Sequence, residues 1–135
     1  MLKHIKTLLK GNIVLISIGI TIGIIYLSLI KVPTIPLQIT HLDKYQHAFA
    51  YFTLTMCWLL SFHKKTPNRK YTIVFACIIF GIILEVLQYK LTQYRTGDYL
   101  DILANTVGVV LALMVFNQFL KKKNELINHK DLHIT

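Results

Sequence analysis

The sequence predicts an all-α membrane protein with four transmembrane helices and both termini in the cytoplasm. Three observations lead to this fold class. Of the 135 residues, 54% are hydrophobic, the apolar residues are gathered in long blocks, and the Lys and Arg residues lie mostly between those blocks. Apolar blocks of about 18 residues or more are typical of membrane spans rather than of a soluble core. The length suits one domain, so we expect a single membrane domain over residues 1–135.

The first predicted span covers residues 13–30 and follows a short segment with three lysines. A secretory signal peptide also begins with basic residues and an apolar run, but this run is long and no small-x-small cleavage pattern follows it. We therefore expect a retained helix. Within it, Gly19-x-x-x-Gly23 would allow a neighbouring helix to approach closely.

Three further spans are expected at residues 42–62, 71–91 and 99–120. Pro33 and Pro36 separate the first two spans, because proline does not suit a helix interior. The chain ends with a polar segment at residues 121–135, which begins with three lysines. We expect this segment to be a flexible cytoplasmic tail.

The distribution of basic residues predicts the orientation. Three Lys precede the first span, four Lys or Arg lie in the loop at residues 63–70, and four follow the fourth span, whereas the opposite side has four in all. Because the more basic side of a membrane protein usually faces the cytoplasm, both termini are placed there. The net charge of +9 is thus an orientation signal, and we expect no nucleic-acid partner.

The two cysteines, Cys57 and Cys77, lie inside apolar segments and lack CxxC spacing. We therefore expect no disulfide framework and no zinc site. The sequence predicts no metal and no cofactor.

Polar side chains enter the predicted spans from the outer side of the membrane. The second span begins with Asp43-Lys44-x-x-His47-x-x-x-Tyr51. Spacings of four residues place Asp43, His47 and Tyr51 near one face of a helix. The beginning of this span is therefore expected to face protein rather than lipid.

The next two spans carry polar groups at a similar depth. Glu85 and Gln88 lie near the end of the third span, Arg95 lies in the following turn, and Asp101 and Asn105 lie near the start of the fourth. A charged side chain at the centre of a bilayer costs about 2.5–3.5 kcal/mol on insertion scales. One shared cluster in the outer half of the membrane would offset these charges against one another, so we expect these groups to converge.

At these residues the chain resembles the VanZ-like family of bacterial membrane proteins. The resemblance covers about residues 42–115 and rests on Asp43-Lys44-x-x-His47-x-x-x-Tyr51, Glu85-x-x-Gln88, Arg95, and Asp101-x-x-x-Asn105-x-x-Gly108. Ala48 and Ala112 depart from the family, which often has an aromatic residue and a second glycine there. The resemblance implies a multi-pass protein of the bacterial cytoplasmic membrane, related to a teicoplanin-resistance protein. It supplies no reaction.

The first functional interpretation is a binding or accessory protein within the lipid bilayer. Its polar cluster would engage an envelope lipid or a glycopeptide and contribute to cell-envelope homeostasis or glycopeptide resistance. Arg95 and Lys44 could hold a phosphate or carboxylate group. The candidate binding residues are Asp43, Lys44, His47, Tyr51, Glu85, Gln88, Arg95, Asp101 and Asn105.

Two other interpretations belong to different classes. An intramembrane enzyme acting on a lipid-linked substrate would use Asp43, His47, Glu85 and Asp101 as candidate catalytic residues, either as general acids and bases or as ligands of a divalent cation. The sequence has no HExxH motif and no phosphate-binding glycine loop. Alternatively, the polar layer is purely structural and joins the helices without a ligand. The sequence does not predict the oligomeric state.

Overall fold

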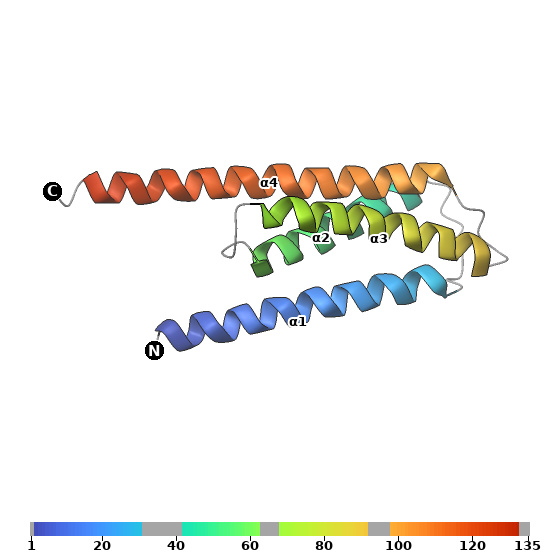
Figure 1. The fold of residues 1–135 in the computed structure, drawn as a ribbon, viewed down its shortest axis with the longest axis horizontal. Helices are drawn as coiled ribbons and strands as arrows, with labels where there is room; N and C mark the ends of the chain where they lie inside the picture. The colour runs from blue at the N-terminus through green and yellow to red at the C-terminus, as the bar shows by residue number, and fades with distance from the viewer. Residues whose placement is uncertain (1, 31–41, 63–67, 92–97, 133–135) are drawn as a thin grey trace.

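The computed structural model describes residues 2–30, 42–62, 68–91 and 98–132, which form a bundle of four α-helices (Figure 1). The helices are α1 (Leu2–Leu29), α2 (Leu42–Phe62), α3 (Arg69–Leu91) and α4 (Tyr99–Leu132). Successive helices alternate in direction, so that α1 begins and α4 ends at the same end of the bundle. The all-helical prediction is confirmed.

Three of these helices are long and apolar enough to cross a membrane. They contribute the segments Asn12–Leu29, Arg69–Leu91 and Tyr99–His129. Helix α2 has 21 residues, but its first turns carry charged and polar side chains that lower its hydropathy. A fourth span at residues 42–62 therefore stays a prediction.

The ends of the helices differ in part from the expected spans. Helix α4 continues to Leu132, beyond the expected end of the span at residue 120, and the flexibility of the tail stays a prediction. This segment contains neither Gly nor Pro and includes four Lys, two Leu and one Glu. Lys, Glu and Leu are good helix formers, and nothing in the segment interrupts the backbone hydrogen bonds. Helix α1 likewise begins at Leu2, well before the apolar block.

The tightest approach between helices joins α2 to α4 at Gly108. A Cβ atom added to Gly108 would overlap the carbonyl oxygen of Ala48, and it would lie 2.9 Å from the Ala48 carbonyl carbon and 3.0 Å from the Phe52 nitrogen. Only glycine allows this contact. By contrast, Gly19 and Gly23 have no atom within 4 Å of an added Cβ, so in the part of the chain described they do not bring another helix close to α1.

The interior of the bundle is small, and its outer surface is apolar. Tyr51, Leu54, Cys77 and Val109 form a buried cluster, whereas large apolar side chains such as Phe75 are exposed on the outer faces of the helices. Large contiguous apolar surface marks a face that meets lipid or another protein. The outer faces of the helices therefore suit contact with lipid or with another protein.

Polar contacts attach α1 to α2. The hydroxyls of Ser17 and Ser61 lie 3.1 Å apart, and Trp58 Nε1 donates a hydrogen bond to Thr21 Oγ1 at 3.2 Å. Small hydroxyl side chains join helices in this way in membranes, where van der Waals packing and hydrogen bonds replace the hydrophobic effect. These contacts keep α1 beside the helices that carry the polar groups discussed next.

Candidate polar site

The polar residues meet at the end of the bundle where α2 and α4 begin and α3 ends. Helix α2 provides Lys44 and His47, α3 provides Glu85, and α4 provides Asp101 and Asn105. Lys44 and His47 are three positions apart on α2, and Asp101 and Asn105 are four apart on α4, which places each pair on one face of its helix. The expected convergence from three helices is therefore present. We refer to these five residues as the polar cluster.

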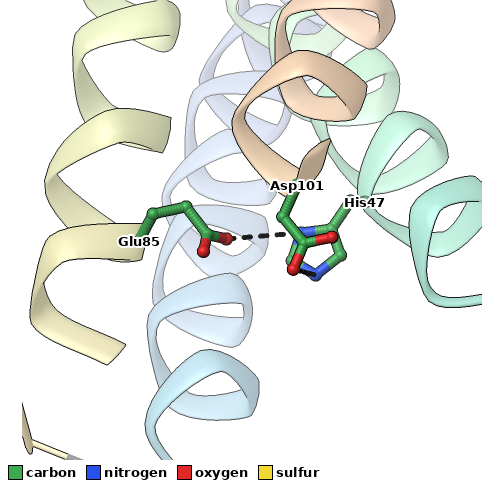
Figure 2. Close-up of side chains that lie close together, drawn as sticks. All are labelled: His47, Glu85 and Asp101. Atoms are coloured by element: carbon green, nitrogen blue, oxygen red, sulfur yellow. Dashed lines mark ion pairs between the residues drawn. The ribbon is translucent and has the colours of Figure 1, made fainter. Parts of the chain in front are cut away.

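His47 lies between two buried carboxylates (Figure 2). Its Nδ1 is 3.9 Å from Glu85 Oε1, and its Nε2 is 3.9 Å from Asp101 Oδ2. Nδ1 also lies 3.1 Å from Asn105 Oδ1. An amide oxygen can only accept, so Nδ1 donates this hydrogen bond and carries a proton. In the neutral ring the lone pair is then on Nε2, on the side of Asp101.

Lys44 gathers the acidic groups at the entrance to the cluster. Its Nζ lies 2.9 Å from Asp43 Oδ2 and 2.6 Å from Asp98 Oδ2, and it also contacts Asp101 Oδ1. An ammonium group has three hydrogen atoms to donate, and three carboxylates receive them here. Asp101 thus bridges Lys44 through one oxygen and His47 through the other.

Burial increases from the rim of the site to its interior. The side chains of Asp43 and Asp98 are 49% and 34% exposed, whereas those of Glu85 and Asp101 are only 6% and 8% exposed. In the described segments, Lys44 contacts the carboxylates of Asp43, Asp98 and Asp101. A fourth carboxylate, that of Glu85, faces His47. Among the described residues, the site is therefore rich in hydrogen-bond acceptors.

Three of the predicted site residues lie around the cluster rather than within it. Tyr51 packs beneath it, and its Cε1 would lie 3.1 Å from a Cβ atom added to Gly81. Gln88 donates a hydrogen bond from Nε2 to the Ser28 carbonyl oxygen of α1 at 2.9 Å, so it joins α3 to α1. Asp43 contacts the cluster through its ion pair with Lys44. Arg95 lies outside the described residues.

Two contacts could not be deduced from the pattern of residues alone. Asp98 caps α4, because its Oδ1 accepts a hydrogen bond from the Leu100 nitrogen at 2.9 Å, and its other oxygen contacts Lys44 at the same time. Ser28 contributes a backbone carbonyl near the end of α1, where carbonyls lack partners within the helix, and no side-chain signal marks it.

A separate apolar cleft lies deeper in the bundle. It has a volume of about 260 Å³ and is bordered by side chains that include Leu54, Trp58 and Phe80. Its walls contain few polar atoms, so it offers little for acid–base or ionic chemistry. The chemical groups of interest are those of the polar cluster.

These features define a class of protein: a small helical bundle suited to a membrane, with a buried acidic and histidine-containing site near one end. Comparison with known families then identifies the group. The VanZ/LLP1 family profile matches residues 18–121, a range that includes all five residues of the polar cluster. The chain belongs to the VanZ/LLP1 family, a membrane-associated family, and the resemblance seen in the sequence is confirmed.

A related protein is found in a eukaryote. The chain is 30% identical over 95 residues to "Uncharacterized protein C11E3.10" of Schizosaccharomyces pombe. The match covers 70% of this chain and 57% of the yeast protein, so the chain spans a little over half the length of that relative. No solved structure matches the chain.

Proposed function

We propose that this chain is a four-span protein of the bacterial cytoplasmic membrane whose outward-facing polar site binds an envelope lipid or a glycopeptide. In this way it contributes to cell-envelope homeostasis or glycopeptide resistance. The observation that carries the proposal is the convergence of Glu85, Asp101 and His47 from three helices at one end of the bundle. Intramembrane ionisable groups are costly, and they mark functional sites more often than chance positions.

The architecture supports a four-span topology. Helix α2 has 21 residues and is therefore about 32 Å long, close to the thickness of the hydrocarbon core. It runs antiparallel to α1 and α3 and parallel to α4, and its polar end contacts α3 and α4. The excess of Lys and Arg at the end that holds both termini favours a cytoplasmic location for that end. The polar cluster then faces outward, and reporter fusions to the two termini test this orientation.

The charges of the site favour a particular kind of ligand group. Lys44 already contacts three carboxylates, so it is poorly placed to hold a phosphate by itself. The oxygens of Glu85, Asp101 and Asn105 are acceptors. Hydroxyl, amide or ammonium groups would donate charge-assisted hydrogen bonds to them. Such groups occur in the sugar and peptide parts of envelope lipids and glycopeptides.

Access to the site is compatible with such a ligand. The gradient from the half-exposed Asp43 to the buried Glu85 and Asp101 gives a ligand polar partners at the rim as well as in the interior. A headgroup can approach from the end of the bundle while its lipid part stays in the bilayer. The apolar outer faces of the helices suit that surrounding lipid.

The direct test measures ligand retention by the wild-type chain and by Glu85→Gln. The purified protein in lipid nanodiscs is incubated with teicoplanin or with a peptidoglycan-precursor lipid, and native mass spectrometry quantifies the bound molecule. We expect the wild type to retain one of these probes and Glu85→Gln to bind it about tenfold more weakly, because one charge-assisted hydrogen bond contributes at least about 1.5 kcal/mol.

Glu125→Gln is the matched control, since Glu125 is an exposed acid far along α4 from the site. It should bind like the wild type. Retention of neither probe by the wild type would contradict the proposal, and so would equal binding by Glu85→Gln and the wild type.

A structural role is the second candidate, and the contacts of Lys44 favour it. An ammonium group shared among carboxylates of α2, α4 and the turn before α4 can hold the helices together without any ligand. In that case Glu85→Gln would lower the yield of folded protein, and the folded wild type would bind neither probe. The intramembrane enzyme is a further alternative, with His47, Glu85 and Asp101 close together and Asp43 at the rim.

A further inference from the structure

We propose that His47, Glu85 and Asp101 bind a divalent transition-metal cation such as Mn²⁺ or Zn²⁺. One imidazole nitrogen and one oxygen from each carboxylate all lie within 4.8 Å of one another, and Figure 2 shows the two carboxylates approaching the ring from α3 and α4. The sequence analysis favoured no metal and considered a divalent cation only within the enzyme interpretation. The proposal goes beyond the binding function above and does not depend on it.

The distances between these groups suit an ion better than direct hydrogen bonds. The ring nitrogens are 3.9 Å from the facing carboxylate oxygens, which is too long for a hydrogen bond. Metal bonds to nitrogen and oxygen are about 2.0–2.2 Å long, so two ligand atoms on one ion lie up to about 4.2 Å apart. Because Nδ1 donates to Asn105, His47 would bind the ion through Nε2, which faces Asp101. Glu85 faces Nδ1, so its side chain would have to shift further than that of Asp101 to reach the same ion; the three ligand atoms already lie within 4.8 Å of one another.

The surroundings of His47 match those of a metal-binding histidine. Such a histidine usually donates its second ring N–H to a carbonyl or carboxylate group, which fixes the tautomer and the orientation of the ring. Asn105 Oδ1 receives this type of hydrogen bond from His47 Nδ1 at 3.1 Å. Asn105 is therefore a positioning residue in this proposal.

The electrostatics of the cluster also favour a cation. Glu85 and Asp101 are more than nine-tenths buried, and both carry carboxylate oxygens that face His47. A divalent ion between them would offset both charges at once. One imidazole and two carboxylates form a mixed nitrogen and oxygen set, which suits Mn²⁺ or Zn²⁺ better than Ca²⁺, an ion that prefers oxygen ligands alone.

The test is a titration of the purified full chain in detergent with Mn²⁺, without lipid or glycopeptide. Electron paramagnetic resonance measures the free Mn²⁺, and Zn²⁺ is then added as a competitor. We expect one Mn²⁺ per chain, displaced by Zn²⁺. Glu85→Gln should weaken binding at least tenfold, and Asn105→Ala should weaken it about 10–100-fold, as for other partners of metal-binding histidines.

Two controls make the result decisive. Glu125→Gln should bind like the wild type, and Asn105→Asp, which keeps an acceptor oxygen, should recover binding lost in Asn105→Ala. Size-exclusion chromatography and circular dichroism identify folded variants. If Glu85→Gln does not fold, the comparison of Asn105→Ala with Asn105→Asp tests the proposal instead.

Absence of stoichiometric binding by the wild type up to about 1 mM Mn²⁺, the weak end for protein cation sites, would overturn the proposal. Equal binding by Glu85→Gln and Glu125→Gln would do so as well.

Because no lipid or glycopeptide is present, failure of this experiment leaves the proposed ligand-binding function standing. Conversely, a chain that binds Mn²⁺ but retains neither organic probe would support the cation site and contradict the binding function.

Discussion

At the scale of single residues, Lys44 determines how several acids can share one end of the bundle. Its ammonium group contacts Asp43, Asp98 and Asp101, and its side chain is only 18% exposed. Ions removed from water are stable only where good geometry and further hydrogen bonds compensate for the lost hydration. With Lys44 in place, the buried Asp101 keeps a charged partner on one oxygen and faces His47 with the other.

Lys44→Met tests this role. The substitution keeps a long flexible side chain but leaves Asp101 without its ammonium partner, and we expect the free energy of unfolding to fall by about 3 kcal/mol, the lower end for breaking a buried ion pair. Unfolding in mixed detergent micelles measures the change.

Asp43→Asn is the matched variant at the exposed end of the same contact. We expect it to cost less than about 1 kcal/mol, because half-exposed ion pairs contribute little. If the two substitutions were equally mild, Lys44 would not stabilise the buried acid.

The residues of the cluster could be predicted because a charged side chain inside a membrane is stable at few positions, mainly where it faces other protein groups. Glu85 and Asp101 could each be expected to face a partner rather than lipid. The partner of Gln88 could not be predicted, because a backbone carbonyl at the end of α1 has no signature in the side-chain pattern. The role of Arg95 also stays a prediction, since it lies outside the described residues.

At the scale of helices, the close contact between α2 and α4 aligns the two halves of the site. Gly108 lies one turn after Asn105, and the backbone of α2 at Ala48 and Phe52 occupies the space beside it. Ala48 directly follows His47 in the chain. The distance between the imidazole and the side chains of α4 therefore depends on this backbone contact.

Gly108→Ala should separate α2 from α4. The added methyl group would overlap the Ala48 carbonyl, and overpacking of this kind costs about 1–3 kcal/mol. We expect lower stability together with weaker binding of Mn²⁺, although no residue of the cluster is altered. Thermal unfolding and the Mn²⁺ titration measure the two effects.

Gly23→Ala is the control on α1, where an added Cβ meets no atom within 4 Å. It should leave stability unchanged or raise it slightly, because alanine is the better helix former. Equal loss from both substitutions would show that the α2–α4 contact has no special role.

The sequence predicted both ends of α2 better than the start of α1 and the end of α4. The polar start and apolar end of α2 define residues 42–62 in both the sequence and the structure. The extension of α4 to Leu132 was missed because the loss of apolar residues was interpreted as the end of the helix, whereas a soluble extension requires only good helix formers. The glycine motif of α1 was misleading, since small residues permit a close contact but do not require one.

At the scale of the whole molecule, the alternating directions of the helices bring the site together. The starts of α2 and α4 and the end of α3 lie at one end of the bundle, opposite the beginning of α1 and the end of α4 (Figure 1). In a membrane, α2, α3 or α4 alone would expose an acid or a histidine to lipid. Packed together, they place these groups against one another and present apolar side chains outward.

The central claim is that His47 and Glu85, from different helices, interact within one site. A double-mutant cycle of His47→Gln and Glu85→Gln, monitored by the free energy of unfolding in mixed micelles, tests it most directly. Residues in one network couple by about 0.5–3 kcal/mol, whereas distant ones add independently. We predict coupling in this range for His47 with Glu85 and none for His47 with the distant Glu125. Additive effects of His47→Gln and Glu85→Gln would contradict the account.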